Sequence, residues 1–279
     1  MNVELLSDTA APRYGYESDE EDQLNPLLNR SIQRPTHVSI QGYPSSDQPP
    51  EVVIIASGEA GKAWAQGAHL GEQRATVIVD ELAVGCIFLP SWSDAAVIVS
   101  ETSASLSTWE MHTYAEGIIG FFNPKRLLLL DIYSVPLYVN QAPLEAYRAP
   151  VRYLRTRSGE ASAPFLVPFS PPNLMQATCA AFASIAALPT SQMQAIVLLL
   201  PSPYISIPRG HDFPPSPPPS TDENGPIWSE NILQEIHICL AELSGMRAHQ
   251  SWQSTGRVVL PKQSGIKRRG DIGDGGMYM

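Results

Sequence analysis

A glycine-containing turn is the first feature of the sequence whose residues could bind a ligand. Residues 57–63 read SGEAGKA and follow a continuously apolar run, which is the context of a phosphate-binding loop. A P-loop, however, needs a glycine five residues before its Gly-Lys pair and a serine or threonine after it, and Ala56 and Ala63 occupy these positions. The dinucleotide pattern G-x-G-x-x-G also fails, because alanine stands at its second glycine. We therefore interpret Gly58 and Gly61 as residues that permit a tight strand-to-helix turn.

The sequence gives equally little support for nucleophilic, acid–base or metal-dependent chemistry. The sequence has no G-x-S-x-G elbow for a serine nucleophile. Asp80, Glu81 and Asp94 follow predicted strands, where α/β enzymes often place acids, but two or three carboxylates at strand ends are a weak signal. The histidines are scattered and lack the H-x-x-x-H spacing of a metal site: His37, His69, His112, His211, His237 and His249. The sequence thus predicts no catalytic residues, no cofactor-binding residues and no metal ligands.

The three cysteines are far apart, and each lies in an apolar context. Cys86, Cys179 and Cys239 form no C-x-x-C pair, so neither a zinc site nor a redox pair has the spacing that it needs. We expect buried free thiols in a reducing compartment.

Composition and charge exclude further classes of function. A net charge of −10 makes nucleic acid an unfavourable partner, because the chain repels phosphate backbones. The basic cluster at 267–269 is more simply a solvated run than a binding stripe. The most apolar runs, at 52–56, 127–130 and 196–200, are far shorter than the ~20 residues of a membrane span. Since no signal peptide is visible in 1–10, we expect a soluble protein of the cytoplasm, with the nucleus as a second location.

Apolar strand patterns alternate with helical ones along the middle of the chain. Buried strands are predicted at 51–57, 95–100, 126–132 and 193–200, and weaker ones at 37–41, 75–80, 86–89 and 151–156. Helices are predicted at 58–69, 108–122 (with a hydroxyl N-cap), 174–188 (from Pro172) and 227–244 (closed by Gly245). This alternation predicts an α/β fold with a mostly parallel central sheet flanked by helices.

Three segments fall outside this pattern. Residues 1–34 contain an acidic run with almost no apolar support, which is typical of a disordered leader. The segment 201–226 is rich in proline and is expected to form a loop of the single α/β domain at 35–262. Residues 263–279 are expected to form a flexible tail, because GDIGDGG at 270–276 offers nothing that can pack.

The tail then ends in Met277, Tyr278 and Met279, two large apolar side chains around an aromatic ring. Hydrophobic side chains at the end of a flexible tether have no folding role, although termini also vary freely. A terminal peptide of this kind can be captured in a pocket, where its carboxylate is read by polar groups and its side chains fill apolar slots. Tyr278 would supply a rigid ring with a hydroxyl group.

The order hydrophobic-Tyr-any residue at the C-terminus resembles the motif that proteasome activators and assembly factors insert between adjacent α subunits of the 20S ring. The chain as a whole resembles the proteasome assembly chaperone 1 family. Besides this motif, the resemblance rests on the acidic leader, the run VVIIASGEAGKAW at 52–64, the segment 153–156, and Pro172-Asn173-Leu174 ahead of an Ala-rich helix. The Pro-rich insert departs from the animal pattern and suggests a fungal-type member.

The resemblance implies a chaperone without catalytic activity. It implies a heterodimer with proteasome assembly chaperone 2 on the outer face of the α ring, anchored through Met277, Tyr278 and Met279 to 20S α subunits. The alternative from the residues is an α/β enzyme acting on a nucleoside or nucleotide at the Gly58/Gly61 turn. A generic scaffold that uses the Pro-rich loop is a third reading. An enzyme should line the cavity at the strand ends with convergent polar groups, whereas a chaperone should leave it small or apolar.

Overall fold

The computed structural model describes residues 36–44, 49–101, 106–140, 144–157, 163–175, 177–205, 227–245 and 251–254. These residues belong to one compact unit, which begins at Thr36. The predicted leader at 1–34, residues 206–226 of the predicted Pro-rich loop, and the predicted tail at 263–279 lie outside the described residues.

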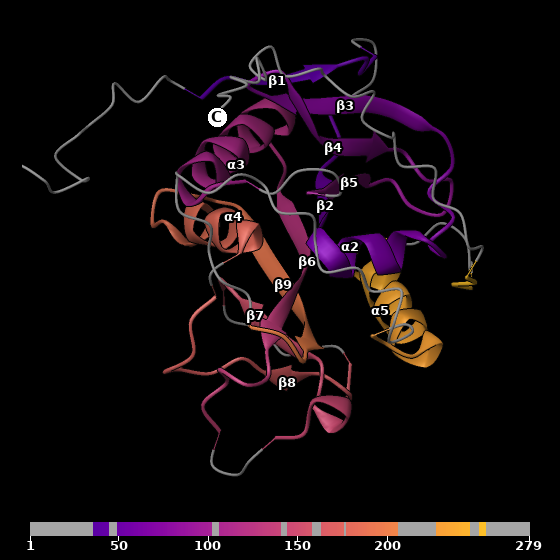
Figure 1. Ribbon diagram of the computed structural model, residues 1–279. Coiled ribbons are helices and arrows are strands. Elements are labelled where there is room, and N and C mark those ends of the chain that lie inside the picture. Colours follow the sequence, from indigo (N-terminus) through magenta and orange to yellow (C-terminus); the bar gives the residue numbers. More distant parts are fainter. Residues whose placement is uncertain are drawn as a thin grey trace, which may run out of the picture. The chain divides into compact units, whose positions relative to one another are not determined.

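A single sheet of nine strands organises the described part of the chain (Figure 1). Its spatial order is β1-β3-β4-β5-β2-β6-β9-β7-β8. The strands are β1 (Val38–Gln41), β2 (Val52–Ser57), β3 (Gln73–Val79), β4 (Leu82–Phe88), β5 (Ala96–Ser100), β6 (Arg126–Ser134), β7 (Arg152–Arg155), β8 (Val167–Pro168) and β9 (Gln194–Ser202).

The four central strands are parallel, as the continuously apolar runs predict. β2 pairs with β5 on one side and β6 on the other, and β9 continues the parallel set beyond β6. The flanks differ, because β4 joins β5 as an antiparallel strand, β3 and β1 extend that side, and β7 is antiparallel to β9. The α/β fold with a central sheet between helices is therefore confirmed, with parallel pairing concentrated at its centre.

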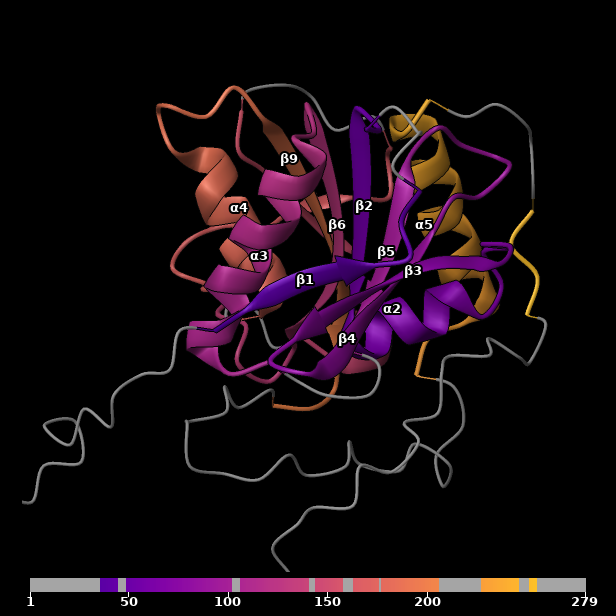
Figure 2. The ribbon, with the colours of Figure 1, turned by 90° about the horizontal axis from the view of Figure 1, so that it is seen from above.

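Helices cover both faces of the sheet (Figure 2). α2 (Gly58–Ala65) and α5 (Glu230–Leu243) lie on one face, and α3 (Thr108–Phe122) and α4 (Thr178–Ala187) lie on the other. A short 3-10 turn, η2 (Ala146–Arg148), precedes β7. β2 shows how one strand serves both layers: Ile54 and Ala56 belong to the core under α2 and α5, and Val53 and Ile55 to the core under α3 and α4.

Local sequence signals set several element boundaries. A hydroxyl group caps α3 as predicted. It belongs to Ser107, and it accepts a hydrogen bond from the backbone N–H of Glu110 while the Glu110 carboxylate accepts one from the N–H of Ser107. Gly245 follows α5 with a φ of 80°, which is the left-handed conformation expected of a glycine at that position. Asp80 and Glu81, predicted at a strand end, form the two-residue turn between β3 and β4, with φ values of 44° and 73°.

Several predicted boundaries are wrong: α2 ends at Ala65 and not at 69, and β4 begins at Leu82 and not at 86. The helix expected from Pro172 begins at Thr178, because the Asn173 side chain binds the backbone N–H and C=O of Val139 and holds the preceding segment outside a helix. β9 runs to Ser202 and thus includes Pro201, which was expected in the loop. The missing N–H of proline is tolerated there, since β7 ends opposite Leu199 and, among the described strands, Pro201 pairs with β6 alone.

Candidate functional site

The predicted docking residues Met277, Tyr278 and Met279 lie outside the described residues, so the structure does not bring them to any site. The segment at 251–254 is held against α2. The indole N–H of Trp252 donates to the Trp64 carbonyl at 2.7 Å, and the Gln253 N–H donates to the Gly67 carbonyl at 3.2 Å. Position 254 is therefore a defined starting point for the chain that follows.

The glycine turn between β2 and α2 has the structural role that was predicted for it. Gly58 has a φ of 56°, which side-chain-bearing residues rarely adopt. A Cβ atom on Gly61 would lie 2.3 Å from the Ala56 carbonyl oxygen, so only glycine lets the helix approach the strand so closely. Both glycines are thus explained by the sharp reversal of the chain.

A small group of buried polar side chains lies where β2 and β6 end. Asp131 is at the end of the apolar run of β6 and accepts hydrogen bonds from the Ile132 N–H at 2.8 Å and the Cys179 N–H at 3.4 Å. The Cys179 sulfur lies 3.7 Å from the Ser57 hydroxyl oxygen and 3.8 Å from the Leu130 carbonyl oxygen, and its single S–H is shared between these two acceptors. The carboxyl ends of parallel strands are where α/β proteins bind ligands, which makes this group a candidate for chemistry.

The electrostatics of this group oppose nucleophilic catalysis. Burial raises the pKa of Asp131 to about 7; the hydrogen bond from Ile132 opposes that effect, and the charge of Glu101 adds to it. Burial, reinforced by the neighbouring Asp131, also raises the pKa of the Cys179 thiol well above its ordinary value. Because the reactive form of cysteine is the thiolate, a fully buried thiol of this kind is inert. Cys86 and Cys239 are buried and free as well, as predicted.

The other polar residues considered in the sequence do not converge. His37 and His112 are exposed, and His112 pairs with Glu116 on the outside of α3. His237 is packed in the core against the indole of Trp92, with ring centroids 5.0 Å apart. Within the described ranges, no group of three or more His, Cys, Asp or Glu side chains could hold a metal ion. No helix in that same part of the chain is long and apolar enough to cross a membrane.

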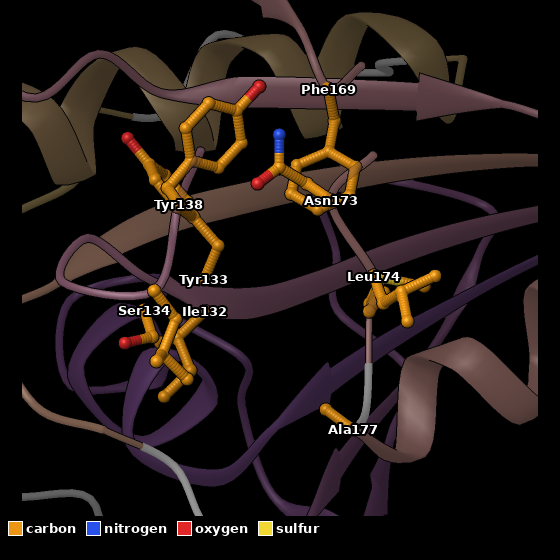
Figure 3. A pocket seen from close by; sticks show the side chains of 10 residues that line it. Ile132, Tyr133, Ser134, Tyr138, Phe169, Asn173, Leu174 and Ala177 are labelled. Carbon is orange, nitrogen blue, oxygen red and sulfur yellow. The ribbon is translucent and has the colours of Figure 1, made fainter. Parts of the chain in front are cut away.

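A pocket of about 80 Å³ lies beside the buried polar group, at the carboxyl end of β6 (Figure 3). Figure 3 shows Tyr133 and Tyr138 on one side and Phe169 and Leu174 on the other. The three aromatic rings pack edge to face, with centroids 5.3 to 6.4 Å apart. The full lining is Ile132, Tyr133, Ser134, Leu137, Tyr138, Phe169, Asn173, Leu174, Met175 and Ala177. We call this feature the aromatic pocket.

A buried cation stands behind the aromatic pocket. The Arg152 guanidinium carbon lies 3.8 Å from the ring centroid of Tyr138 and 5.6 Å from that of Tyr133, which is stacking distance. Its Nη1 donates to the Pro168 carbonyl at 3.0 Å, while its Nε has no hydrogen-bond partner. Of the three ion pairs found among the described residues, none includes Arg152. A buried positive charge, without a carboxylate partner among the described residues, therefore lies behind the tyrosines that line the pocket.

Sequence reasoning missed the aromatic pocket and the buried polar group. Asp131 carries a signal in the sequence, since it is the one charged residue in the run LLLLDIY. The pocket carries none, because its two walls come from segments about 35 residues apart that meet only in the folded chain. Arg152 lies on a short strand whose other residues are half-buried, so its complete burial does not follow from the pattern.

Comparison with known proteins gives likenesses of fold. No family model matches the chain, and no curated protein matches it. Among solved structures, it is similar to Pyrococcus furiosus PbaA, an archaeal homolog of proteasome-assembly chaperone, with 9% identity, a TM-score of 0.45, and 77% of this chain and 84% of that chain covered. It is also similar to P. furiosus PbaB, an archaeal proteasome activator, with 11% identity, a TM-score of 0.41, and 58% and 79% covered.

A protein of unknown function from Thermoplasma acidophilum shows the same degree of likeness, with 11% identity, a TM-score of 0.38, and 65% of this chain and 73% of that chain covered. At such identities and TM-scores these likenesses concern the fold and carry no argument about function. The structure itself defines the class: a mixed α/β domain with a sheet between two helical layers and a small aromatic pocket at the end of its central strands.

Proposed function

We propose that this chain is a chaperone for assembly of the 20S proteasome, a fungal-type member of the proteasome assembly chaperone 1 family. It acts as a heterodimer with proteasome assembly chaperone 2 on the outer face of the α ring, in the cytoplasm and the nucleus. Met277, Tyr278 and Met279 anchor it to 20S α subunits. The observation that carries this proposal is the order hydrophobic-Tyr-X in the last three residues of the sequence, behind the glycine-rich segment 270–276.

The geometry at the strand ends favours a binding protein over the alternative enzyme. The cavity there is small and lined chiefly by aromatic and aliphatic side chains, whereas an enzyme acting on a nucleoside would need convergent polar groups around a larger space. The Gly58/Gly61 turn is accounted for by backbone conformation and close packing. Cys179, the thiol of the neighbouring buried polar group, is fully buried with a raised pKa.

A pull-down of 20S α rings with the full chain tests the proposal, provided that the affinity tag leaves the last residue free. Deleting Met277 to Met279 should weaken binding, because a tyrosine buried in a pocket commonly contributes ~2 kcal/mol or more to an interface. Adding one residue after Met279 should cause a similar loss by displacing the carboxylate, which simple hydrophobic contact would not require. The isolated chain should stay folded in both variants, with a thermal midpoint that shifts by no more than a few degrees.

Unchanged affinity for α rings in both the deletion and the extension variant would show that the tail is not the anchor. Partial retention of binding is compatible with the proposal, since a permanent heterodimer offers further contact surface. The matched control is Leu188→Asp, which alters an exposed side chain at the end of α4 and should leave ring binding intact.

A further inference from the structure

The rim of the aromatic pocket exposes several large apolar side chains to solvent. Leu174 is 80% exposed, Val139 62% and Leu137 55%, and Leu174 and Leu137 also line the cavity. Asn173 fixes this arrangement, because its Oδ1 accepts from the Val139 N–H at 2.7 Å and its Nδ2 donates to the Val139 carbonyl at 3.1 Å. The apolar rim is thus held open by polar contacts and is ready to receive an apolar ligand.

The charge behind the pocket specifies the ligand further. Arg152 is only 5% exposed, and none of the ion pairs in the described part of the chain involves it. A buried cation without a counter-ion is unfavourable, so negative charge brought to the pocket mouth is attracted. The aromatic rings of Tyr133, Tyr138 and Phe169 suit a thioether or another ring, since sulfur–aromatic and edge-to-face contacts are both favourable. The fitting ligand is a short peptide with methionine and aromatic side chains and a net negative charge.

The chain itself contains such a peptide. Residues 270–279 read GDIGDGGMYM, with two aspartates, no lysine or arginine, and Met277, Tyr278 and Met279 together. The pocket of about 80 Å³ has room for two or three water molecules, and hence for most of one side chain, at ~30 Å³ of liquid volume per water. One methionine side chain would fill it, and the exposed Leu174 and Leu137 would cover the neighbouring residues.

The segment is also long enough to reach. Ser254 is the last described residue, and Met277 is 23 positions further along. Fully extended, that length spans about 80 Å. A domain of about 200 residues has a radius of gyration of roughly 16 Å, so half its circumference is about 65 Å. Any point on the surface, the aromatic pocket included, therefore lies within reach of Met277.

We propose that residues 277–279 dock into the aromatic pocket of their own chain, so that the tail is sequestered until a proteasome surface competes for it. This inference rests on the proposed function, because the surface that competes for the tail is the α ring named there. A tether of this length holds the tail at an effective concentration of about 1 mM, so an intrinsic Kd of ~0.1 mM leaves about one tail in eleven free. Docking within the chain then lowers the affinity for α rings by about tenfold and limits stable capture to sites that bind the tail more tightly.

The test uses the isolated full chain with the photo-crosslinking residue p-benzoylphenylalanine in place of Tyr278. Irradiation should give crosslinks within one chain to residues 132–138 or 169–175, at a yield that does not depend on protein concentration. Leu174→Asp should reduce that yield at least fivefold, because it places a charge on the apolar rim, whereas Leu188→Asp, on an exposed leucine at the far end of α4, should not. Crosslinks only to other segments, or only between chains, would overturn the proposal.

A measurement of α-ring binding distinguishes a failure of this inference from a failure of the proposed function. If both hold, Leu174→Asp binds α rings up to tenfold more tightly than the unmodified chain. Crosslinks to the pocket in a chain that never binds α rings would retain the docking and refute the proteasome anchor. Binding of α rings through the tail, with no crosslink to either pocket segment, would retain the anchor and refute the docking.

Discussion

Replacing the buried Asp131 with asparagine should change how stability depends on pH. Burial raises the pKa of Asp131 from its ordinary value of 3.8 to about 7 in the folded chain. In the unfolded chain the carboxyl group ionises near pH 4, so the folded state binds a proton that the unfolded state has lost. The contribution of this residue to stability is therefore fully present below pH 4 and is lost as the pH rises to 7. A difference of about three pKa units corresponds to about 4 kcal/mol.

Asp131→Asn removes this titration with little change of shape. The amide oxygen can still accept from the Ile132 N–H, and the loss is the longer bond from the Cys179 N–H at 3.4 Å, worth about 1 kcal/mol. At pH 8.5 the variant should be about 3 kcal/mol more stable than the unmodified chain, and at pH 4 up to about 1 kcal/mol less stable. For a domain whose total stability is 5–15 kcal/mol, the change at pH 8.5 is large.

Urea unfolding at pH 4, 5.5, 7 and 8.5 measures the difference between the two proteins. The difference isolates Asp131, because all other titrating groups are shared. Glu116→Gln is the matched control: its side chain is 61% exposed and pairs only with His112 among the ion pairs of the described residues, so its effect should stay below about 1 kcal/mol. A stability difference between Asp131→Asn and the parent that is the same at pH 4 and pH 8.5 would refute the assignment of a neutral, buried carboxyl group.

Three further predictions concern local packing and reactivity. Gly61→Ala should destabilise the fold by more than ~2 kcal/mol in urea unfolding, because its Cβ would lie 2.3 Å from the Ala56 carbonyl oxygen, whereas Gly120→Ala, with no atom within 4 Å of its Cβ, should stabilise α3 by up to ~1 kcal/mol. Equal effects of the two substitutions would contradict the close approach of α2 to β2. Ser107→Ala should cost about 1 kcal/mol through loss of the cap, measured as a lower thermal midpoint, while Ser107→Asp should restore most of it. Cys86, Cys179 and Cys239 should react with a thiol reagent only as fast as the chain opens, and rapid labelling of all three at native pH and low denaturant would show that they are not buried.

The sequence predicts the centre of the sheet better than its margins, for a physical reason. The runs at 52–56 and 127–130 are apolar on every residue and rich in β-branched or leucine side chains, which is typical of strands buried on both faces. Ser107 and Gly245 mark helix ends because capping depends on neighbouring backbone groups alone. The two-residue strand β8 carries no such pattern and forms only because β7 is beside it.

The candidate site depends on contacts that are distant in the sequence. Asp131 becomes a neutral, buried group only because α4 begins beside it at Thr178, and that start is displaced from Pro172 by the bonds between Asn173 and Val139. The aromatic pocket requires residues 132–138 and 169–177 to meet, which no local rule predicts. The docking role of Met277, Tyr278 and Met279 stays a prediction, since these residues lie beyond the described part of the chain.

The order of the elements along the chain has a consequence for folding during synthesis. The face of the sheet that bears α2 is completed only by α5 and Trp252, which emerge from the ribosome last among the described elements. Until then Trp64 and the residues of β2 and β6 that share this core remain uncovered, although the opposite layer already has α3 and α4 in place. A nascent chain with one finished and one open hydrophobic layer is prone to aggregate and is a natural client for general folding factors. Early termination between β9 and α5 would leave the product permanently in that state.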